Sequence, residues 1–226
     1  MIIALWRKIT SMNRIGRTLE QMLYNTHRRN LRFLPMDNPP QLSVHPLTPD
    51  RFADFERLFG PRGATGGCWC MFWKLRGKAF SENKGEPNRQ MQQSIVESGT
   101  VPGLLAYADG LPVGWIAVEP RGAYPRLAHS RVLQPVDDHP VWSVTCFFVD
   151  GKYRRRGVTV SLLKAAVDYV RSKGGRIVEG YPVESDGKSP DVFVYTGTLA
   201  AFQKAGFKEV ARNSPTRPIV RFLISS

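Results

Sequence analysis

A short basic turn between an apolar run and a helical pattern is the part of this 226-residue sequence best suited to bind an anion. Residues 144–149 are rich in β-branched and aromatic side chains, which is typical of a buried strand. The turn that follows contains Arg154, Arg155 and Arg156, and a helical pattern begins at Gly157. The first N–H groups of a helix have no partners within it and carry partial positive charge, and a glycine lets an anion approach closely. The sequence therefore predicts a phosphate-type site at this helix start.

The three cysteines raise the question of a metal or a nucleophile, and their pattern favours neither. Cys68 and Cys70 form a Cys-x-Cys pair, but zinc normally takes four nitrogen or sulfur ligands, no second pair follows, and the four histidines are scattered. We therefore expect no metal. Cys146 lies in the apolar run without a nearby histidine, and burial raises a thiol pKa, so we do not expect it to act as a nucleophile. An odd number of cysteines without a secretory signal favours a cytoplasmic protein.

Composition and charge indicate an ordinary globular chain that binds anionic ligands. Hydrophobic residues make up 42% and charged residues 23% of the sequence, and the formal net charge is +13. This charge suits a polyphosphate coenzyme as well as a nucleic acid, and does not choose between them. No apolar stretch reaches the about 18 residues that a membrane-spanning helix needs. We expect residues 1–38 to be a basic extension, either disordered or helical, and residues 39–226 to form the domain.

The periodicity of the domain predicts an α/β protein with a mixed sheet. Strands are expected at 42–47, 103–108, 113–118, 141–149, 176–181, 207–211 and 219–224, and helices at 50–59, 89–98, 157–173 and 199–205. Asp109-Gly110 predicts a hairpin. Residues 78–88 are expected to be a polar loop, and 120–139 a basic stretch with a short helix or an ordered loop. This order gives antiparallel neighbours and one βαβ crossover, which lies at the basic turn.

The element order over residues 41–224 resembles the fold of the Gcn5-related N-acetyltransferases (GNAT), a mostly antiparallel sheet with one βαβ crossover at the coenzyme site. Two short motifs agree with it. Residues 154–159 read Arg-x-x-Gly-x-Thr, which resembles the family's Q/R-x-x-G-x-G/A signature for the pyrophosphate of acetyl-CoA, and residues 202–207 read Phe-x-x-x-Gly-Phe, which is similar to the ending of its last helix. Residues 68–71 (Cys-Trp-Cys-Met) and 179–182 (Glu-Gly-Tyr-Pro) also resemble a bacterial subgroup of the family.

The resemblance implies that acetyl-CoA is bound as the acyl donor, without a metal. Backbone groups of the strand would bond the pantetheine arm, and the amides and arginines of the turn would hold the pyrophosphate. The threonine in place of glycine or alanine is a mild departure, because its hydroxyl is able to bond a phosphate. The implied coenzyme contacts are Phe147, Phe148, Val149, Arg154, Arg155, Arg156, Gly157, Val158, Thr159, Val160 and Phe202.

The resemblance also implies direct attack of a primary amine on the thioester. A base must take a proton from the amine, and an acid can protonate the leaving thiolate. The family's usual tyrosine falls at Phe202 and the glutamate of some members falls near Ser143, so both usual groups are missing. Tyr195 is the candidate acid and Glu119 the candidate base. A tyrosine that only packs and a solvated carboxylate at a strand end are the alternatives.

The acceptor side is expected in the aromatic stretch around Trp69 and Trp73, which would form either plain core or one wall of a substrate pocket. Glu184 and Asp191 are candidates to attract a cationic acceptor. The expected function is acetylation of an amine on a small molecule or a protein. A non-catalytic acyl-CoA-binding module and a basic RNA-binding protein remain as alternatives, although we do not expect nucleic acid as a partner. A homodimer is left open.

Overall fold

The structure, a computed structural model, describes residues 41–184 and 194–225, so the expected basic extension at 1–38 lies outside the described residues. The described strands are β1 (Leu42–Pro46), β2 (Gly103–Ala108), β3 (Leu111–Pro120), β4 (Trp142–Val149), β5 (Ile177–Gly180), β6 (Lys208–Arg212) and β7 (Pro218–Leu223). The helices are α2 (Phe52–Phe59), α3 (Gly77–Glu82), α4 (Glu86–Glu97), α5 (Pro125–Ala128), α6 (Val158–Ser172) and α7 (Leu199–Lys204), with short helical turns between some of them. None of these helices is long and apolar enough to cross a membrane.

The strands form one seven-stranded sheet in the order β1-β2-β3-β4-β5-β7-β6. Only β4 and β5 run parallel, and all other neighbours are antiparallel. The helix that links the parallel pair is α6, so the predicted βαβ crossover at the basic turn is confirmed. The predicted hairpin is also confirmed. Asp109 and Gly110 both adopt positive φ angles, 50° and 73°, between the paired residues Ala108 and Leu111, as a two-residue turn requires.

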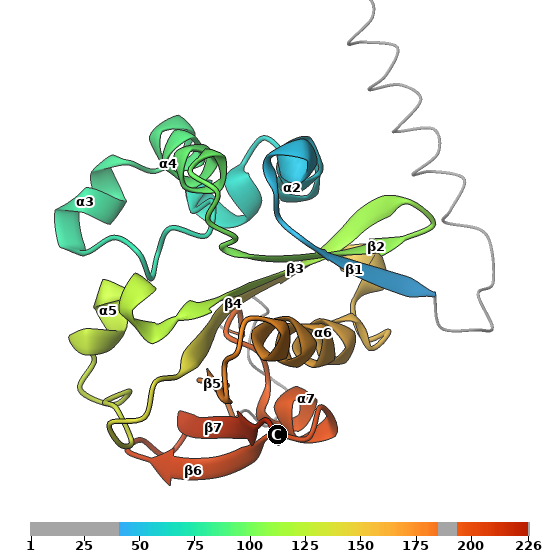
Figure 1. Cartoon of the computed structure of the whole chain (residues 1–226). Coiled ribbons are helices and arrows are strands. Elements are labelled where there is room, and N and C mark those ends of the chain that lie inside the picture. The colour runs from blue at the N-terminus through green and yellow to red at the C-terminus, as the bar shows by residue number, and fades with distance from the viewer. Residues whose placement is uncertain (1–40, 185–193, 226) are drawn as a thin grey trace, which may run out of the picture. The chain divides into compact units, whose positions relative to one another are not determined.

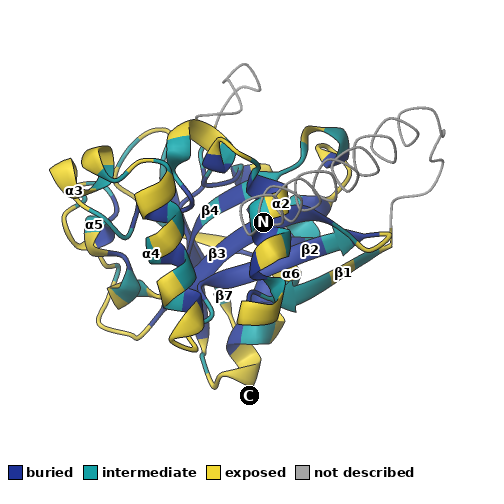
Figure 2. Cartoon of the chain, turned by 90° about the horizontal axis from the view of Figure 1, so that it is seen from above, coloured by how far each residue is buried: buried dark blue, intermediate teal, exposed yellow. Residues whose placement is uncertain are grey.

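Helices cover both faces of the sheet (Figure 1). On one face lie α6 and α7, and α6 buries its apolar stripe, including Leu162 and Val170, against the central strands. Gly114 of β3 permits this approach, because a Cβ there would lie 2.7 Å from Val158 Cγ1. On the other face, α2 packs Phe55 against Trp115, with ring centroids 4.9 Å apart. Figure 2 shows the resulting pattern, with buried central strands and helices exposed on their outer sides.

The expected polar loop at 78–88 is wrong. Residues Gly77–Glu82 form α3, and α4 begins at Glu86, three residues before the predicted start at Arg89. Pro87 explains the earlier start, because a proline is favoured in the first turn of a helix, where its missing N–H costs no bond.

Strands β4 and β5 pair along only part of β4. Their pairing covers Trp142 to Val144, after which β5 ends at Gly180. The residues of β4 from Cys146 to Val149 therefore keep their β3 neighbour on one side and have no β5 neighbour on the other. A register shift beside Ala117 lies at the same level. The two parallel strands thus open away from each other immediately before the basic turn.

A charge network links the exposed Asp137, in the loop before β4, to the buried side chains of Glu179 on β5 and Arg221 on β7. Arg221 donates from Nε to Glu179 Oε2 at 2.8 Å and from Nη1 to Asp137 Oδ2 at 2.6 Å, and Arg121 donates to Glu179 Oε1 at 3.0 Å. The bond to Arg221 lowers the pKa of Asp137 to about 2. Because the pKa of Asp137 is lower in the folded protein than in the unfolded chain, its ionised carboxylate stabilises the folded state at any pH above the pKa of the unfolded chain. This contribution is lost as the pH falls through about 2.

The Asp137→Asn variant tests this contribution. We expect wild type to unfold at a higher temperature than the variant at neutral pH, and the difference to shrink as the pH falls from the ordinary aspartate range to about 2. Thermal unfolding followed by circular dichroism across this range measures the effect. A difference that does not change with pH would show that Asp137 acts through packing alone.

Candidate active site

A large cavity of about 980 Å³ follows the open part of β4. Its volume lies at the upper end of the range of about 300–1,000 Å³ for small-molecule sites. Four parts of the fold form its described walls: the end of β4, the start of α6, the segment around α7, and the segment from the end of α2 to α4. The lining residues are 146–149; 153–155 and 157–160; 194–195, 198, 200–201 and 204; and 59, 64–66, 68, 70, 72–73, 80 and 84, in the same order. The cavity therefore joins the basic turn to the aromatic segment that precedes α4.

The start of α6 is arranged to hold an anion at one end of this cavity. Gly157 adopts a left-handed conformation with φ of 82°, and no atom lies within 4 Å of where a Cβ would be. The first intrahelical bond shown there is from the Ser161 N–H to the Gly157 carbonyl at 3.0 Å, so the N–H groups of Val158 to Val160 precede it. Arg155 and Lys204 add cationic side chains to the same wall. These groups fit the diphosphate of a coenzyme.

The open edge of β4 carries two internal hydrogen bonds that a bound ligand would have to replace. The Phe147 N–H donates to the Tyr195 carbonyl at 2.6 Å, and Arg154 Nε donates to the Val149 carbonyl at 3.1 Å. Phe147, Phe148 and Val149 all line the cavity, as do residues 153–155 and 157–160, whereas Arg156 does not. The expected coenzyme contacts are therefore brought together, with their backbone groups partly engaged.

Four residues expected at the site lie elsewhere. The Arg156 guanidinium lies 6.0 Å from the Tyr153 ring and outside the cavity wall. Phe202 is fully buried and fills the space beside Gly180, where a Cβ would lie 2.1 Å from its ring. Trp69 stacks on the core residue Phe59 at 5.8 Å, whereas Trp73 lines the cavity. Glu184 forms an ion pair with Arg212 outside the cavity, and Asp191 lies outside the described residues.

Glu119 is buried rather than solvated at the end of its strand. Its side chain is 6% exposed and forms an ion pair with Lys74, which is 10% exposed. Burial raises the pKa of Glu119, and Lys74 opposes this rise. Glu119 is paired in register with Ser143, two residues before the point where β4 leaves β5. The carboxylate does not line the cavity itself, so any proton it takes must arrive through intervening groups.

Three buried polar groups near Glu119 have no hydrogen-bond partner among the described residues. They are Trp73 Nε1, Tyr124 Oη and Thr145 Oγ1. Lys74 Nζ lies 5.3 Å from the Tyr124 ring, and the pKa of Tyr124 is raised by burial and by the Glu119 carboxylate. Trp73 lines the cavity. Unsatisfied buried groups are rare in native proteins and call for water or a ligand. Their position suits a polar path between Glu119 and the cavity.

Tyr195 lines the cavity and packs edge-on against Phe72, with ring centroids 6.0 Å apart. Burial raises its pKa, and Arg217 opposes this rise. The phenol therefore keeps its proton at neutral pH and is available as a donor. Packing and proton donation are both compatible with this position, so the acid role of Tyr195 stays a prediction.

The two segments that carry cysteines meet at the cavity. Trp115 Nε1 donates to Cys70 Sγ at 3.1 Å, and Cys146 lines the cavity beside it. Trp69 and Cys70 adopt φ angles of 46° and 62°, a left-handed conformation that costs about 1–2 kcal/mol for each non-glycine residue. The neighbouring Cys70 and desolvation raise the pKa of Cys146. No described cluster of His, Cys, Asp or Glu is able to hold a metal ion.

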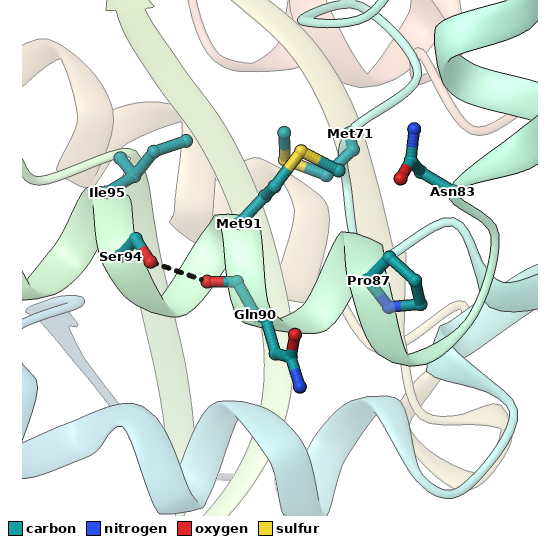
Figure 3. Close-up of a pocket in the computed structure, with 7 residues that line it drawn as sticks. All are labelled: Met71, Asn83, Pro87, Gln90, Met91, Ser94 and Ile95. Carbon is teal, nitrogen blue, oxygen red and sulfur yellow. Dashed lines mark hydrogen bonds between the residues drawn. The ribbon is translucent and has the colours of Figure 1, made fainter.

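A second, shallower cavity of about 470 Å³ lies beside α4 (Figure 3). Met71 and Met91 lie next to each other in it, and its polar groups are the amides of Asn83 and Gln90 and the hydroxyl of Ser94. None of its described lining residues is titratable. The groups able to transfer a proton or bind phosphate are therefore found at the larger cavity.

Several residues at the site have no signal in the sequence. Lys74, Tyr124 and Thr145 come from three different segments, and only the tertiary fold brings them near Glu119. Lys204 extends the cationic wall from α7, where the sequence pattern reads as an ordinary basic helix end. A buried strand residue with a hydroxyl in an otherwise apolar run is the one available hint, and it applies to Thr145.

Comparison with known proteins agrees with this geometry. The model of the acetyltransferase (GNAT) family matches residues 69–188, which is more than half of the chain. A search of curated protein sequences finds no significant match.

Similar solved structures include GNAT-family acetyltransferases from Listeria monocytogenes 4b F2365 and Streptococcus agalactiae 2603. The first is 9% identical, covers 81% of this chain and 95% of its own, and has a TM-score of 0.50. The second is 12% identical, covers 82% and 96%, and also has a TM-score of 0.50. The PaiA N-acetyltransferase from Thermoplasma acidophilum, solved with coenzyme A, is 12% identical, covers 81% and 99%, and has a TM-score of 0.47. At these identities the likeness shows the fold, and together with the family match it establishes that the chain belongs to the GNAT family and is an acyl-CoA-dependent acetyltransferase.

Proposed function

We propose that the large cavity holds acetyl-CoA with its diphosphate at the start of α6 and its pantetheine arm along β4. The thioester then lies near Cys146, where a primary amine attacks it directly. The observation that carries this proposal is the continuity of the cavity, which reaches from Gly157 along Phe147 to Trp73. One end offers unpaired helix amides and cations, and the other offers an enclosed aromatic wall, so donor and acceptor can meet between them.

The acceptor is an amine with an apolar body, on a small molecule or at an exposed position of a protein. Phe72, Trp73 and Phe80 give the acceptor end an aromatic surface, and Lys84 lies 5.5 Å from the Phe80 ring. Among the described residues that line the cavity, none is aspartate or glutamate. Such a wall suits an arylalkylamine better than a polyamine, because several positive charges would meet cations and no carboxylate.

Glu119 is the base that finally takes the proton of the attacking amine. The proton travels through water and the buried hydroxyls of Tyr124 and Thr145, which have no hydrogen-bond partner among the described residues. Lys74 favours the ionised carboxylate and so opposes the rise in its pKa that burial causes. We also propose membership of the bacterial subgroup with the Cys-Trp-Cys-Met stretch, on the strength of residues 68–71.

Binding and turnover test this function in two steps. Isothermal titration calorimetry with acetyl-CoA is expected to show one site, and desulfo-CoA, which has no thiol or acyl group, should compete for it. Release of free thiol is then followed with a panel of amines, in which arylalkylamines are expected to exceed polyamines in kcat/KM. Absence of acetyl-CoA binding at millimolar ligand would overturn the proposal. Binding without turnover on any amine would leave only a coenzyme-binding module.

The Tyr195→Phe variant tests the proposed acid. A general acid typically contributes about 10²–10⁴-fold, and we expect a loss at or below the lower end of this range, because a thiolate is a good leaving group. The loss should appear in kcat and leave the KM for acetyl-CoA nearly unchanged, since the ring and its contact with Phe72 remain. Steady-state kinetics measure both constants. A raised KM with an unchanged kcat would assign Tyr195 to packing.

A further inference from the structure

All three cysteines of the chain line the large cavity, although they come from two distant segments. Cys68 and Cys70 belong to the loop between α2 and α3, and Cys146 belongs to β4. Direct transfer of an acetyl group to an amine gives none of them a role. Their meeting at the end of the cavity where the thioester is expected therefore needs its own explanation.

The position of Cys70 is set by β3 and β4. Its sulfur accepts the Trp115 N–H at 3.1 Å, and the sheet register places Trp115 opposite Phe148 and Ala117 opposite Cys146. Cys70 thus lies over the part of β4 along which the pantetheine arm is expected. The left-handed backbone of Trp69 and Cys70 holds the sulfur there, and such strain is found preferentially at functional sites.

The three thiols differ in their readiness to react. The neighbouring Cys146 thiol and the N–H that Trp115 donates to the Cys70 sulfur at 3.1 Å lower the pKa of Cys70 despite its burial. Burial raises the pKa of Cys68 to about 11, and the neighbouring Cys70 together with burial raises the pKa of Cys146. The thiolate is the nucleophilic form of cysteine, so Cys70 is the reactive member.

We propose that Cys70 is an internal acyl acceptor, which takes the acetyl group from acetyl-CoA when no amine occupies the cavity. The proposal rests on the placement of acetyl-CoA given above. A bond forms between Cys70 Sγ and the acyl carbon, and the bond from that carbon to the coenzyme sulfur breaks. The electron pair stays on the coenzyme sulfur, which ends with the proton that Cys70 gives up. One thioester replaces another, so no oxidant or further reactant is needed.

The modified Cys70 has a consequence for the amine reaction. An acetyl group on its sulfur lies inside the cavity beside Cys146 and next to the aromatic wall. It therefore reduces the room for an acceptor until an amine or free coenzyme A removes it. The chain would accumulate acetyl-Cys70 when acetyl-CoA is abundant and the acceptor is absent.

Mass spectrometry of the intact full-length protein tests the proposal. Incubation with acetyl-CoA alone is expected to add one acetyl group, which free coenzyme A reverses and which fragment spectra place on Cys70 rather than on Cys68. Two probes are used in parallel. A small thioester without the nucleotide, S-acetyl-N-acetylcysteamine, reports acyl transfer, and iodoacetamide reports the pH at which each thiol becomes reactive.

Variants at the three cysteines are expected to differ in acetyl labelling and in the pH at which Cys70 is alkylated. Cys70→Ser should lose the label, and Cys68→Ser should keep it. Cys146→Ala removes the neighbouring thiol that lowers the pKa of Cys70, so iodoacetamide should alkylate Cys70 only at higher pH than in wild type. This measurement needs no transfer activity and detects a folded but less reactive protein.

Three outcomes separate this proposal from the proposed function. Acetyl-CoA that binds without labelling Cys70, or labels Cys68 or Cys146 instead, would overturn the internal acceptor and leave amine transfer standing. Labelling by the small thioester but not by acetyl-CoA would support Cys70 as an acceptor and overturn the coenzyme placement. Alkylation of Cys70 at no lower pH than Cys68 would overturn the assignment of Cys70 as the nucleophile.

Discussion

Replacement of Glu119 by glutamine is expected to slow acetyl transfer about 10²–10⁴-fold, the usual effect of losing a general base, while acetyl-CoA still binds. Burial raises the pKa of this carboxyl, which brings it closer to the working pH than an ordinary glutamate. A base acts only in its ionised form, so kcat/KM of wild type should fall as the pH is lowered through this pKa. The glutamine variant should lose this acid limb. Measurement of kcat/KM against pH tests the prediction.

Two further variants separate proton transfer from the cost of breaking a buried ion pair, which is about 3–5 kcal/mol. Lys74→Gln removes the cation that lowers the Glu119 pKa, so the acid limb should move to higher pH. Glu179→Gln removes another buried carboxylate, which bonds Arg121 and Arg221, and should leave the limb in place. A folded Glu119→Gln protein with the wild-type pH profile would contradict the assignment of the base.

Replacement of Gly157 by valine is expected to weaken acetyl-CoA binding roughly 10–100-fold, which corresponds to the loss of one bond to a charged group. The φ angle of 82° is unfavourable for valine, and its side chain would enter the open space in front of the α6 amides. The backbone strain and the occupied space both lower the affinity of this site for the diphosphate of acetyl-CoA. Calorimetry with acetyl-CoA measures the loss in affinity, and steady-state kinetics should show it in KM.

Gly174 offers a matched control at the other end of the same helix. Its φ angle is 75°, and no atom lies within 4 Å of where a Cβ would be, so valine there introduces similar strain without approaching the cavity. Both variants are expected to lose about 1–2 kcal/mol of stability. Only Gly157→Val should lose acetyl-CoA affinity. Equal loss of affinity in both variants would show that α6 stability, rather than the anion site, governs coenzyme binding.

The coenzyme half of the site follows from the sequence because its parts are contiguous. An apolar strand, a basic turn with Gly157 and an amphipathic helix predict the crossover and its anion site by local chemistry alone. The Asp109-Gly110 hairpin is readable for the same reason, since two residues set the turn and the turn sets the pairing. The motif at 202–207 is readable as well, although the structure shows Phe202 packed beside Gly180 rather than in the cavity.

The proton-transfer and thiol groups were decided by the tertiary structure. Lys74 and Glu119 are 45 positions apart, as are Cys70 and Trp115, and their meeting depends on how the loop between α2 and α3 packs on β3. The aromatic stretch that contains Cys70 has left-handed residues, so no helical or strand period tells which of its side chains reaches the cavity. Local sequence determines the strand, turn and helix where we propose that the acetyl donor binds. Long-range packing determines which side chains lie near that place, because each of those contacts joins segments whose spacing along the chain carries no signal.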